Sequence, residues 1–472
     1  MPAVIRPSHP AVNASFVVFL ILALATSLNA QSRADIDRLG EEAVRRTQEY
    51  LRINTTNPPG NEAAAAVFFA RIFKHEGIAF DSVSSAPGRG NIWARLKGTG
   101  SEPALVLLHH MDVVPADPKY WESDPFAAAT RDGHVYGRGA LDTKTLGIVQ
   151  LQAFLALHRA RVPLRRDVIF LATADEEAGG AYGAGWLVKN RPDAFTGAGL
   201  VLNEGDDGSV EDGRELFSIE VTQKVPLWLG LVSTGKPGHG SGPPVSTAVT
   251  RLVRALYRIQ THEFPPHIVP AVDAYFKGMG RSARAEWKEP FQDIAKASAD
   301  RNTMLKLQMW QPRLAALLRN ACSITMLQGS AKINVIPPEA RAQIDCRLLP
   351  DQDPAAFTRE LESVINDPQI SVEKIMGFSP AVSSTDTPLY RAIEATIRRH
   401  FPAANITPSV QTGFTDSHFF RDLGIASYGF GPFLIPVADE AGVHGNDERI
   451  SLENIRRGTG MMLEIVKAVA GR

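Results

Sequence analysis

Three apolar runs in the first half of the chain each end in acidic or histidine residues. They read ALVLLHHMDVV (104–114), DVIFLATADEE (167–177) and GLVLNEG (199–205), and a helical pattern over 143–161 separates the first run from the second. Continuous apolar strands interleaved with helices predict an α/β fold in which a mostly parallel sheet is flanked by helices on both faces. Ligands bind beyond the carboxyl ends of the strands in such sheets. The sequence therefore predicts a polar site at that edge of the sheet.

The pattern changes at Lys224. Residues 225–378 read as strand, helix, two strands, helix and strand, which is the order of a split βαβ sandwich. Residues 265–318 read as a helical insertion within this unit. The first pattern returns over residues 379–472. We therefore expect one α/β domain, residues 31–224 and 379–472, interrupted by a smaller α+β domain.

The N-terminus is different in kind. Arg6 precedes the apolar run FVVFLILALA (16–25), which is followed by TSLNA and then by polar residues. This arrangement predicts an export signal over residues 1–30, cleaved near Ala30, and hence a periplasmic or extracellular protein. The alternative is an uncleaved membrane anchor, because the apolar stretch is only slightly shorter than a membrane span of about 17 residues.

Charge and cysteine content exclude several classes of protein. Lys plus Arg number 50 against 51 for Asp plus Glu, so no overall positive charge favours a nucleic acid or an anionic membrane, and we expect a small-molecule substrate. Two cysteines, Cys322 and Cys346, are too few for a disulfide-dense scaffold or a Cys-rich zinc site. Both lie in strand-like runs, so either they form a disulfide between neighbouring strands or they are two unpaired thiols of the core.

Seven acidic or histidine residues are expected at one edge of the predicted sheet. Carboxylates packed this densely repel one another unless they share protons or a cation. A set of histidines and carboxylates without thiols suits zinc, manganese or cobalt better than copper or an iron–sulfur cluster. The residues are His110, Asp112, Asp142, Glu176, Glu177, Glu204 and His444.

The motifs around these residues resemble those of a known family, the di-zinc exopeptidases and amidohydrolases that include aminoacylase, carboxypeptidase S, glutamate carboxypeptidase and succinyl-diaminopimelate desuccinylase. The resemblance covers nearly all of the chain after the export segment. The helical insertion and the spellings HMDVVP and GHGSGPP are most similar to the carboxypeptidase S branch. The motifs, in family order, are HMDVVP, YGRGALDTK, ADEEAGG, NEG, GKPGHGSGPP, NVIPPEARAQIDCRLLP and HGNDERI.

The resemblance implies a site for two divalent metal ions per chain, with zinc expected and cobalt or manganese as alternatives. It makes His110 and Glu204 the terminal ligands of one ion, Glu177 and His444 those of the other, and Asp142 the bridge between them. Two ions about 3.5 to 4 Å apart acidify a bridging water molecule.

The resemblance also implies three supporting features of the same site. Asp112 would orient the His110 imidazole. Glu176 would be the general base and Glu177 a metal ligand. Adjacent side chains on an extended strand end point in opposite directions, so two different roles fit these neighbours better than two ligands of the same ion. The peptide bond after Asp142 would be cis.

The smaller domain would supply the substrate contacts. His239 in GKPGHGSGPP matches the family's lid histidine, which in dimeric members reaches the partner's site and stabilises the oxyanion. Asn334 and Arg347 match residues that hold the substrate's carbonyl and α-carboxylate, and an arginine bonds a carboxylate with its planar fork. We therefore expect a homodimer formed through this lid domain.

Rival functions lack their signatures. The chain has no G-x-S-x-G elbow of a serine hydrolase and no H-E-x-x-H motif of a one-zinc peptidase. One alternative stays open, a catalytically inactive, metal-containing binding protein for acyl-amino acids. The sequence predicts an exported, metal-dependent hydrolase of the amide or peptide bond next to a free C-terminal amino acid, which is a carboxypeptidase, a dipeptidase or an N-acyl-amino-acid amidohydrolase.

Overall fold

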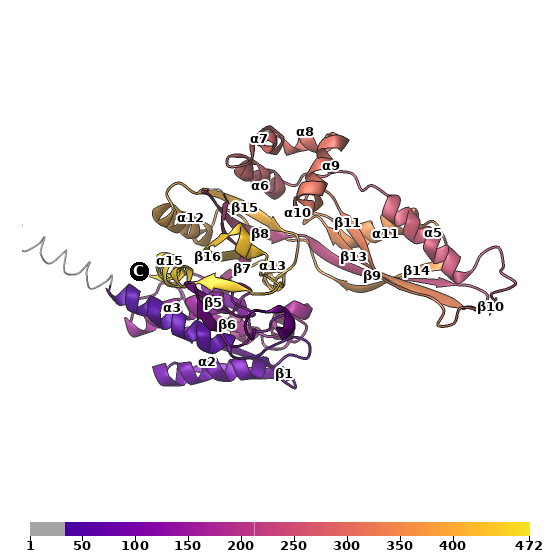
Figure 1. Cartoon of the computed structure of the whole chain (residues 1–472). Helices are drawn as coiled ribbons and strands as arrows, with labels where there is room; N and C mark the ends of the chain where they lie inside the picture. Colours follow the sequence, from indigo (N-terminus) through magenta and orange to yellow (C-terminus); the bar gives the residue numbers. More distant parts are fainter. Residues whose placement is uncertain (1–33, 212) are drawn as a thin grey trace, which may run out of the picture.

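An eight-stranded sheet forms the centre of the larger part of the molecule in the computed structural model, which describes residues 34–211 and 213–472 (Figure 1). In spatial order its strands are β1 (Phe80–Ala86), β2 (Arg89–Leu96), β6 (Val168–Thr173), β3 (Ala104–His110), β7 (Ala198–Glu211), β16 (Ala426–Pro436), β8 (Arg214–Gln223) and β15 (Asn405–Gln411). The pairings β6–β3, β3–β7, β7–β16 and β8–β15 are parallel. The predicted α/β fold with a mostly parallel sheet is therefore confirmed.

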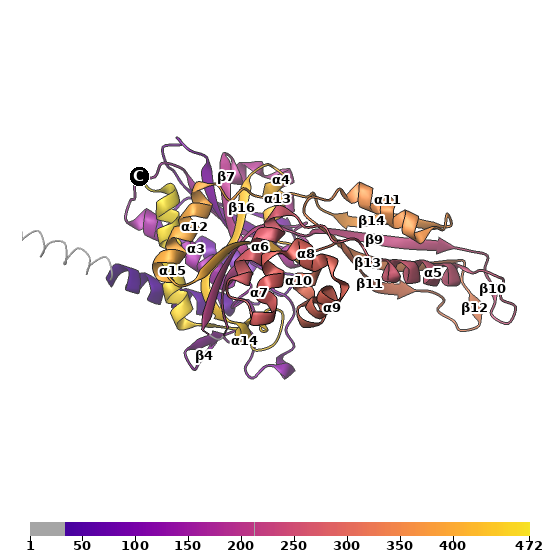
Figure 2. The same cartoon turned by 90° about the horizontal axis from the view of Figure 1, so that it is seen from above.

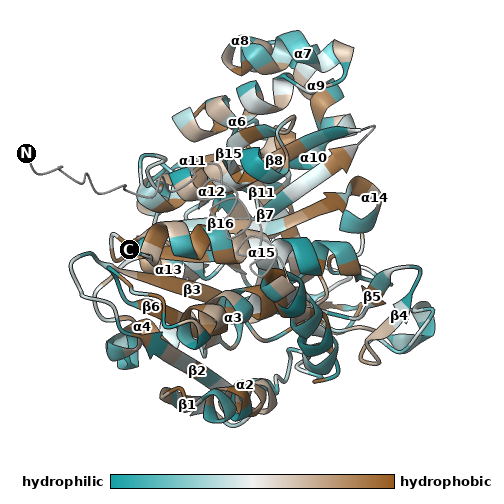
Figure 3. Ribbon diagram, turned by 90° about the vertical axis from the view of Figure 1, so that its left-hand side faces the viewer, coloured by the Kyte–Doolittle hydropathy of each residue, from teal (hydrophilic) through white to brown (hydrophobic). Residues whose placement is uncertain are grey.

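Both faces of this sheet are buried because its strands carry apolar side chains on both sides (Figure 3). In β3, Leu105 and Leu107 point to one face and Val106 and Leu108 to the other, and all four side chains are fully buried. The first face packs on the helix over residues 34–51 and on α2 (Glu62–Glu76), α3 (Lys144–Arg159), α12 (Pro388–His400) and α15 (Leu452–Ala470). The second face packs on α4 (Ala184–Asn190) and α13 (Ser417–Arg421).

The smaller domain is a four-stranded antiparallel sheet that extends away from the larger one (Figure 2). In spatial order its strands are β11 (Ala321–Gln328), β13 (Glu339–Leu348), β9 (Val225–Thr234) and β14 (Ile370–Gly377), and helices α5 (Ala248–Thr261) and α11 (Pro354–Ile365) pack on one face. Along the chain the order is β9, α5, β11, β13, α11 and β14, as predicted for a split βαβ unit. The two-residue strands β10 (Gly238–His239) and β12 (Val335–Ile336) pair at its far tip.

The two cysteines form a disulfide within this smaller sheet. Cys322 on β11 lies opposite Cys346 on β13, and the S–S distance is 1.98 Å. Of the two alternatives left open by the sequence, the disulfide is the one found. The bond ties the edge strand β11, which is exposed from Ser323 onward, to the interior strand that carries Arg347.

The helical insertion packs on the larger sheet although it interrupts the smaller domain in sequence. Gly278 lies so close to Thr407 of β15 that a Cβ atom at this glycine would be 2.2 Å from Thr407 Oγ1. Phe276 and Val410 of β15 belong to one hydrophobic cluster. The insertion therefore builds a wall beside the β15 edge. Its helices are α6 (Pro270–Gly280), α7 (Ala285–Gln292), α8 (Ile294–Ala299), α9 (Arg301–Trp310) and α10 (Pro312–Ala316).

The remaining elements are short. They are β4 (Ala129–Arg131), β5 (His134–Tyr136) and β17 (Arg449–Ser451), which form a third sheet, and the helices η1 (Pro118–Tyr120), η2 (Glu176–Ala178), η3 (Pro192–Phe195) and α14 (Val437–Glu440). Within the described ranges, no helix combines the length and the hydrophobicity that a membrane span requires. The predicted export signal or anchor falls in residues 1–30, outside the described residues.

Candidate metal centre and active site

The five predicted metal ligands come together at the carboxyl ends of the central strands. His110 is the last residue of β3, and Glu204 lies in β7, which pairs with β3. Glu177 follows β6 in the turn η2. Asp142 lies just before α3, and His444 comes from the loop after α14. The fold therefore collects at one sheet edge residues that are widely spaced along the chain.

Asp142 lies between the two histidines. Its Oδ1 is 3.0 Å from His110 Nε2, and its Oδ2 is 3.0 Å from His444 Nε2. His110 Nε2 is also 3.2 Å from Glu204 Oε2, and His444 Nε2 is 3.3 Å from Glu177 Oε2. The cluster thus consists of two half-sites that share one carboxylate.

The side chains of the cluster fit divalent metal ions. Ligand atoms of His110, Asp142 and Glu177 lie within 4.8 Å of one another, and so do those of His110, Glu176 and Glu204. Imidazole nitrogens and carboxylate oxygens are ligands that zinc accepts. Glu177 Oε1 is buried and has no hydrogen-bond partner among the described residues, so this oxygen can bind a cation.

The electrostatics of the cluster also favours added positive charge. Burial raises the pKa of Glu204 to about 7, and burial followed by repulsion from Glu204 raises the pKa of Glu176 well above its ordinary value. Burial opposes the ionisation of Asp142 too, but hydrogen bonds with the two histidines hold its pKa below the usual range. The hydrogen bond with Asp142 is the largest of the effects that raise the pKa of His444 to about 10. A metal ion that binds such a set of ligands displaces their protons.

Glu176 and Glu177 lie in a 3-10 turn and not on an extended strand end, so the geometric expectation from the sequence is wrong. Asp175 adopts a left-handed conformation with φ 67°, which turns the chain directly after β6. The turn still separates the two carboxylates. Glu176 groups with His110 and Glu204, whereas Glu177 groups with His110 and Asp142 and also lies 3.3 Å from His444.

Asp112 supports this turn as well as His110. Its buried carboxylate accepts a hydrogen bond from the backbone N–H of Glu176 at Oδ1 and one from that of Glu177 at Oδ2, each at 3.1 Å. His110 Nδ1 is 3.4 Å from Asp112 Oδ1 and 3.0 Å from the Asp112 backbone oxygen, so the carbonyl is the closer partner of the ring. Asp112 therefore connects His110 to the turn that carries both glutamates.

Glu448 holds the loop that carries Asp142, and the sequence patterns do not single it out. Its fully buried carboxylate is 2.6 Å from Arg138 Nη1 and accepts hydrogen bonds from the backbone N–H groups of Gly139, Leu141 and Asp142 at 2.9, 2.7 and 3.0 Å. The only local signal is that Glu448 stands in the HGNDERI motif. The peptide bond after Asp142 is cis, as the resemblance implies.

His109 takes no part in the cluster. Its ring is fully buried among the rings of Tyr50, Phe69 and Phe170, with centroid distances of 6.2, 5.4 and 5.3 Å. Burial lowers its pKa to about 3, so the ring is neutral. His109 is therefore a core residue on the opposite face of β3 from His110, as strand alternation predicts.

A cavity of about 1030 Å³ opens on the cluster. Asp142, Glu204 and His444 line one part of it, and Arg347 of β13 lines it from the smaller domain. Arg347 Nε and Nη2 donate to Asp345 at 2.8 and 3.1 Å, while Nη1 is buried and has no hydrogen-bond partner within the described part of the chain. One arm of the guanidinium can therefore bind a carboxylate in the cavity. The insertion and the segment GFTDSHFF complete the wall with Tyr275, Arg313, Gly413 and Thr415.

Comparison with known proteins agrees with this geometry. The profile of peptidase family M20/M25/M40 matches residues 106–468, well over half of the chain. This chain belongs to peptidase family M20/M25/M40. The N-fatty-acyl-amino acid synthase/hydrolase PM20D1 of Xenopus tropicalis is 32% identical over 371 residues, which cover 76% of this chain and 72% of the relative. Human aminoacylase-1 is 27% identical over 433 residues, which cover 90% of this chain and 94% of the relative.

A solved structure of the M20 family shares the fold. The metallo-carboxypeptidase Sso-CP2 from Sulfolobus solfataricus gives a TM-score of 0.68 at 20% identity and covers 91% of this chain and 99% of its own. Membership of the M20/M25/M40 family, together with the metal-binding geometry, makes the chain a metallohydrolase. The carboxypeptidase S branch in particular stays a prediction.

Two predicted substrate residues of this M20/M25/M40 chain lie away from its metal cluster. His239 and Asn334 are exposed at the tip of the smaller domain, where β10 pairs with β12 (Figure 1). His239 Nδ1 is 2.7 Å from Ser241 Oγ, and the Gly240 N–H donates to the Asn334 carbonyl at 2.9 Å. Neither His239 nor Asn334 lines the cavity beside the cluster, in contrast to Arg347.

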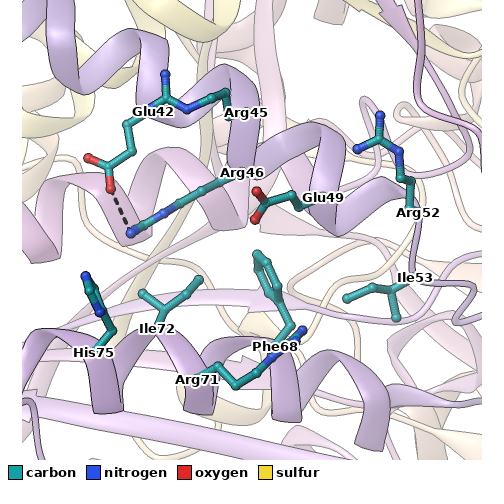
Figure 4. A pocket seen from close by; sticks show the side chains of 10 residues that line it. All are labelled: Glu42, Arg45, Arg46, Glu49, Arg52, Ile53, Phe68, Arg71, Ile72 and His75. Atoms are coloured by element: carbon teal, nitrogen blue, oxygen red, sulfur yellow. Dashed lines mark ion pairs between the residues drawn. The ribbon is translucent and has the colours of Figure 1, made fainter.

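A second cavity of the M20/M25/M40 chain contains none of the predicted site residues. It has a volume of about 700 Å³ and lies between the helix over residues 34–51 and α2 (Figure 4). Arg45, Arg46 and Arg71 line it together with glutamates, and Arg46 pairs with Glu42 at 2.7 Å. This groove is a charged surface between two neighbouring helices, whereas the first cavity is the one that the predicted metal ligands line.

Proposed function

We propose that the protein hydrolyses the amide bond that joins an acyl group or a peptide to a free C-terminal amino acid. The observation that supports this most strongly is the Asp142 carboxylate between His110 and His444, with Glu176 buried in the same cluster. A shared carboxylate suits two bridged ions, and a neighbouring carboxyl group suits proton transfer from water.

Each half of the cluster would hold one divalent ion, with zinc expected and cobalt or manganese as alternatives. His110 and Glu204 would bind one ion, Glu177 and His444 the other, and Asp142 would bind both. When bound, the ions would acidify a water molecule and polarise the substrate carbonyl.

Glu176 would transfer the proton. Its carboxylate takes a proton from the attacking water and returns that proton to the leaving amine. Burial, followed by repulsion from Glu204, raises the pKa of Glu176 above its ordinary value, which makes this carboxylate a stronger proton acceptor than a free glutamate.

Arg347 would bind the α-carboxylate of the substrate through Nη1, the arm that has no partner within residues 34–211 and 213–472. A cavity of about 1030 Å³ leaves room for an acyl group beyond the amino acid. The relatives named above, an N-fatty-acyl-amino acid synthase/hydrolase, an aminoacylase and a metallo-carboxypeptidase, belong to the same class of chemistry.

Two chains would associate through the smaller domain, so that His239 and Asn334 of each chain serve the other's site. β11 is an edge strand of its sheet, and its exposed apolar side chains include Met326 and Leu327, 59% and 62% exposed. An unpaired strand edge with apolar side chains is a surface that pairs readily with another chain. A second copy of this chain is therefore the proposed partner.

The protein would be exported, with cleavage near Ala30. Mass spectrometry of the protein recovered from cells that express the full chain tests this: an N-terminus at Gln31 in the exported fraction supports cleavage, and an intact N-terminus in the membrane fraction supports the anchor.

The test of the proposed activity is hydrolysis of a panel of N-acyl amino acids and dipeptides by zinc-loaded and by chelator-stripped protein. Metal content is measured on the same samples. We expect chelator-sensitive release of the C-terminal amino acid with about two metal ions per chain. Two bound ions without turnover of any substrate would favour the inactive binding protein instead.

A further inference from the structure

A buried polar network lies beneath the turn that carries Glu176 and Glu177, and the proposed mechanism does not use it. Its centre is Arg89, the first residue of β2, which is 7% exposed. Arg89 Nη1 donates to Glu62 Oε1 at 2.6 Å, and Nη2 donates to Asn57 Oδ1 at 2.7 Å. One guanidinium thus joins β2 to the start of α2 and to the loop before it.

The network reaches the turn along two routes from Arg89 and by one further hydrogen bond, from the Asp175 N–H to Glu62 Oε1 at 3.3 Å. In the first, Arg89 Nη2 is 3.2 Å from Oδ1 of Asp175, the left-handed residue that begins the turn, and Asp175 Oδ2 accepts the Tyr182 N–H at 2.9 Å. In the second, Asn57 Nδ2 donates to Asp112 Oδ2 at 2.8 Å and to Asp175 Oδ1 at 3.2 Å. Because Asp112 accepts the backbone N–H groups of the turn, both routes end on the same short segment.

Water cannot replace a lost partner in this network. Glu62, Asp175 and Asn57 are 0%, 2% and 4% exposed. Burying such an ion pair is weak support for stability, because the cost of removing both charges from water offsets most of their attraction. Its clearer consequence is a fixed geometry for the groups that it joins.

We infer that Arg89 is a positioning residue for the proposed reaction, which holds the turn so that Glu176 faces the reacting atoms and Glu177 reaches its metal ion. The inference rests on the proposed function of these two glutamates. Arg89 contacts neither of their carboxylates and acts through Asn57 and Asp175. A lysine keeps the charge, but its single ammonium lacks the planar fork that bonds acceptors on different segments.

The experiment compares Arg89→Lys with Arg95→Lys, a matched change in the same strand, where Arg95 pairs with Asp167 at 3.0 Å. In Arg89→Lys we expect kcat to fall about 10- to 100-fold with KM unchanged. A titration of the metal-free protein with Co²⁺, measured by visible absorption, should show that one of the two bound ions is held about 10- to 100-fold more weakly than in the wild type. In Arg95→Lys both quantities should equal those of the wild type, and circular dichroism should show that both variants are folded at the assay temperature.

Wild-type kcat and Co²⁺ affinity in Arg89→Lys would overturn the inference, and so would equal losses in Arg95→Lys. If Arg89→Lys does not fold, Asn57→Ala decides, because it removes the hydrogen bonds to Asp112 and Asp175 and leaves the charge pairs of Arg89 intact. The same losses in Asn57→Ala support the inference, and wild-type values overturn it. A wild-type protein that binds Co²⁺ but hydrolyses nothing would remove the proposed function, and the Co²⁺ affinities would still test Arg89.

Discussion

The cluster of histidines and carboxylates at the sheet edge and the tip of the smaller domain are assembled in opposite ways. At the sheet edge, His110 and His444 are far apart in sequence, yet each lies 3.0 Å from the same Asp142 carboxylate. At the tip, His239 and Asn334 are exposed, and the hydrogen bonds beside them stay within the paired strands β10 and β12 and their turns. One chain therefore supplies all the proposed metal ligands and the proposed general base. The tip residues His239 and Asn334 can serve a site only if another chain is present or the domains move.

The largest effect should come from Glu176→Gln, which removes the proposed general base at the sheet edge. We expect kcat to fall about 10²- to 10⁴-fold, because glutamine has the same shape but cannot take up the proton. Metal content and the unfolding midpoint should not change. Steady-state kinetics with metal analysis checks this, and Glu49→Gln, at an exposed position of the second cavity, is the control that should keep the wild-type kcat. Turnover near the wild-type rate in Glu176→Gln would remove this residue from the mechanism.

The second-largest effect should come from His239→Ala, which removes the proposed oxyanion donor at the tip. We expect kcat to fall about 10²- to 10³-fold, because the substitution removes a donor to the developing oxyanion. Metal content should stay that of the wild type, as measured on the same samples. A loss of metal ions would show instead that His239 is a ligand, contrary to the proposed roles.

A mixture of these two variants tests whether His239 acts on the site of its own chain or on that of a partner. A dimer of one Glu176→Gln chain and one His239→Ala chain contains one site in which both residues are wild type, provided that His239 acts across the interface. Random re-association should restore about a quarter of the wild-type activity, since half of the dimers are mixed and each mixed dimer has one intact site. If native mass spectrometry detects mixed dimers and activity does not return, the tip acts on its own chain.

A smaller effect is expected for Arg347→Lys, at the point where the smaller domain reaches the cavity of its own chain. A lysine has a single ammonium and cannot bond both Asp345 and the substrate carboxylate as the guanidinium does. KM should therefore rise about 10- to 100-fold, which is the contribution of one hydrogen bond to a charged group, and kcat should change little. Initial-rate kinetics measure both constants. Arg341→Lys on the same strand, where the arginine is exposed and pairs with Glu339, is the control that should leave KM unaltered. A fall in kcat alone would assign Arg347 to the chemical step.

The smallest effect concerns Lys224, which joins the two domains between β8 and β9. Its buried Nζ donates to the carbonyls of Ala316 and Arg319 at 2.6 and 2.7 Å, and burial, followed by repulsion from Arg347, lowers its pKa to about 7. An unfolded lysine keeps its proton up to about pH 10.4, so between these values the unfolded state binds more protons and stability rises with pH.

Relative to Lys224→Met, the free energy of unfolding of the wild type should therefore increase from pH 7 to pH 9 by at most about 1.4 kcal/mol per unit. Urea unfolding of both proteins at several pH values measures the difference. A difference that does not change with pH would mean that Lys224 keeps its proton in the folded protein.

The convergence of the proposed metal ligands could be predicted because local patterns mark these residues. His110, Glu177 and Glu204 stand at the ends of apolar runs, and a parallel sheet brings such ends to one edge. The disulfide could be offered only as an alternative, because which strands become neighbours depends on long-range packing. The turn at Asp175 was missed for a similar reason, since its left-handed φ has no marker in the sequence.

The supporting contacts could not be predicted. Glu448 accepts hydrogen bonds from a loop about 300 residues earlier, and Arg89 connects three segments through buried side chains, so no local pattern identifies either partner set. The place of the insertion against β15 and the distance of His239 from the cluster likewise follow from the fold. Which site His239 serves depends on how chains associate.

We propose that Asp142 and the residues around it bind two metal ions that hydrolysis requires. The most direct test is a titration of metal-free protein with Zn²⁺ in which bound metal and the rate of amino-acid release from an N-acyl amino acid are measured together. We expect no hydrolysis without metal and a maximal rate once about two ions per chain are bound. Full activity of the metal-free protein would contradict this proposal.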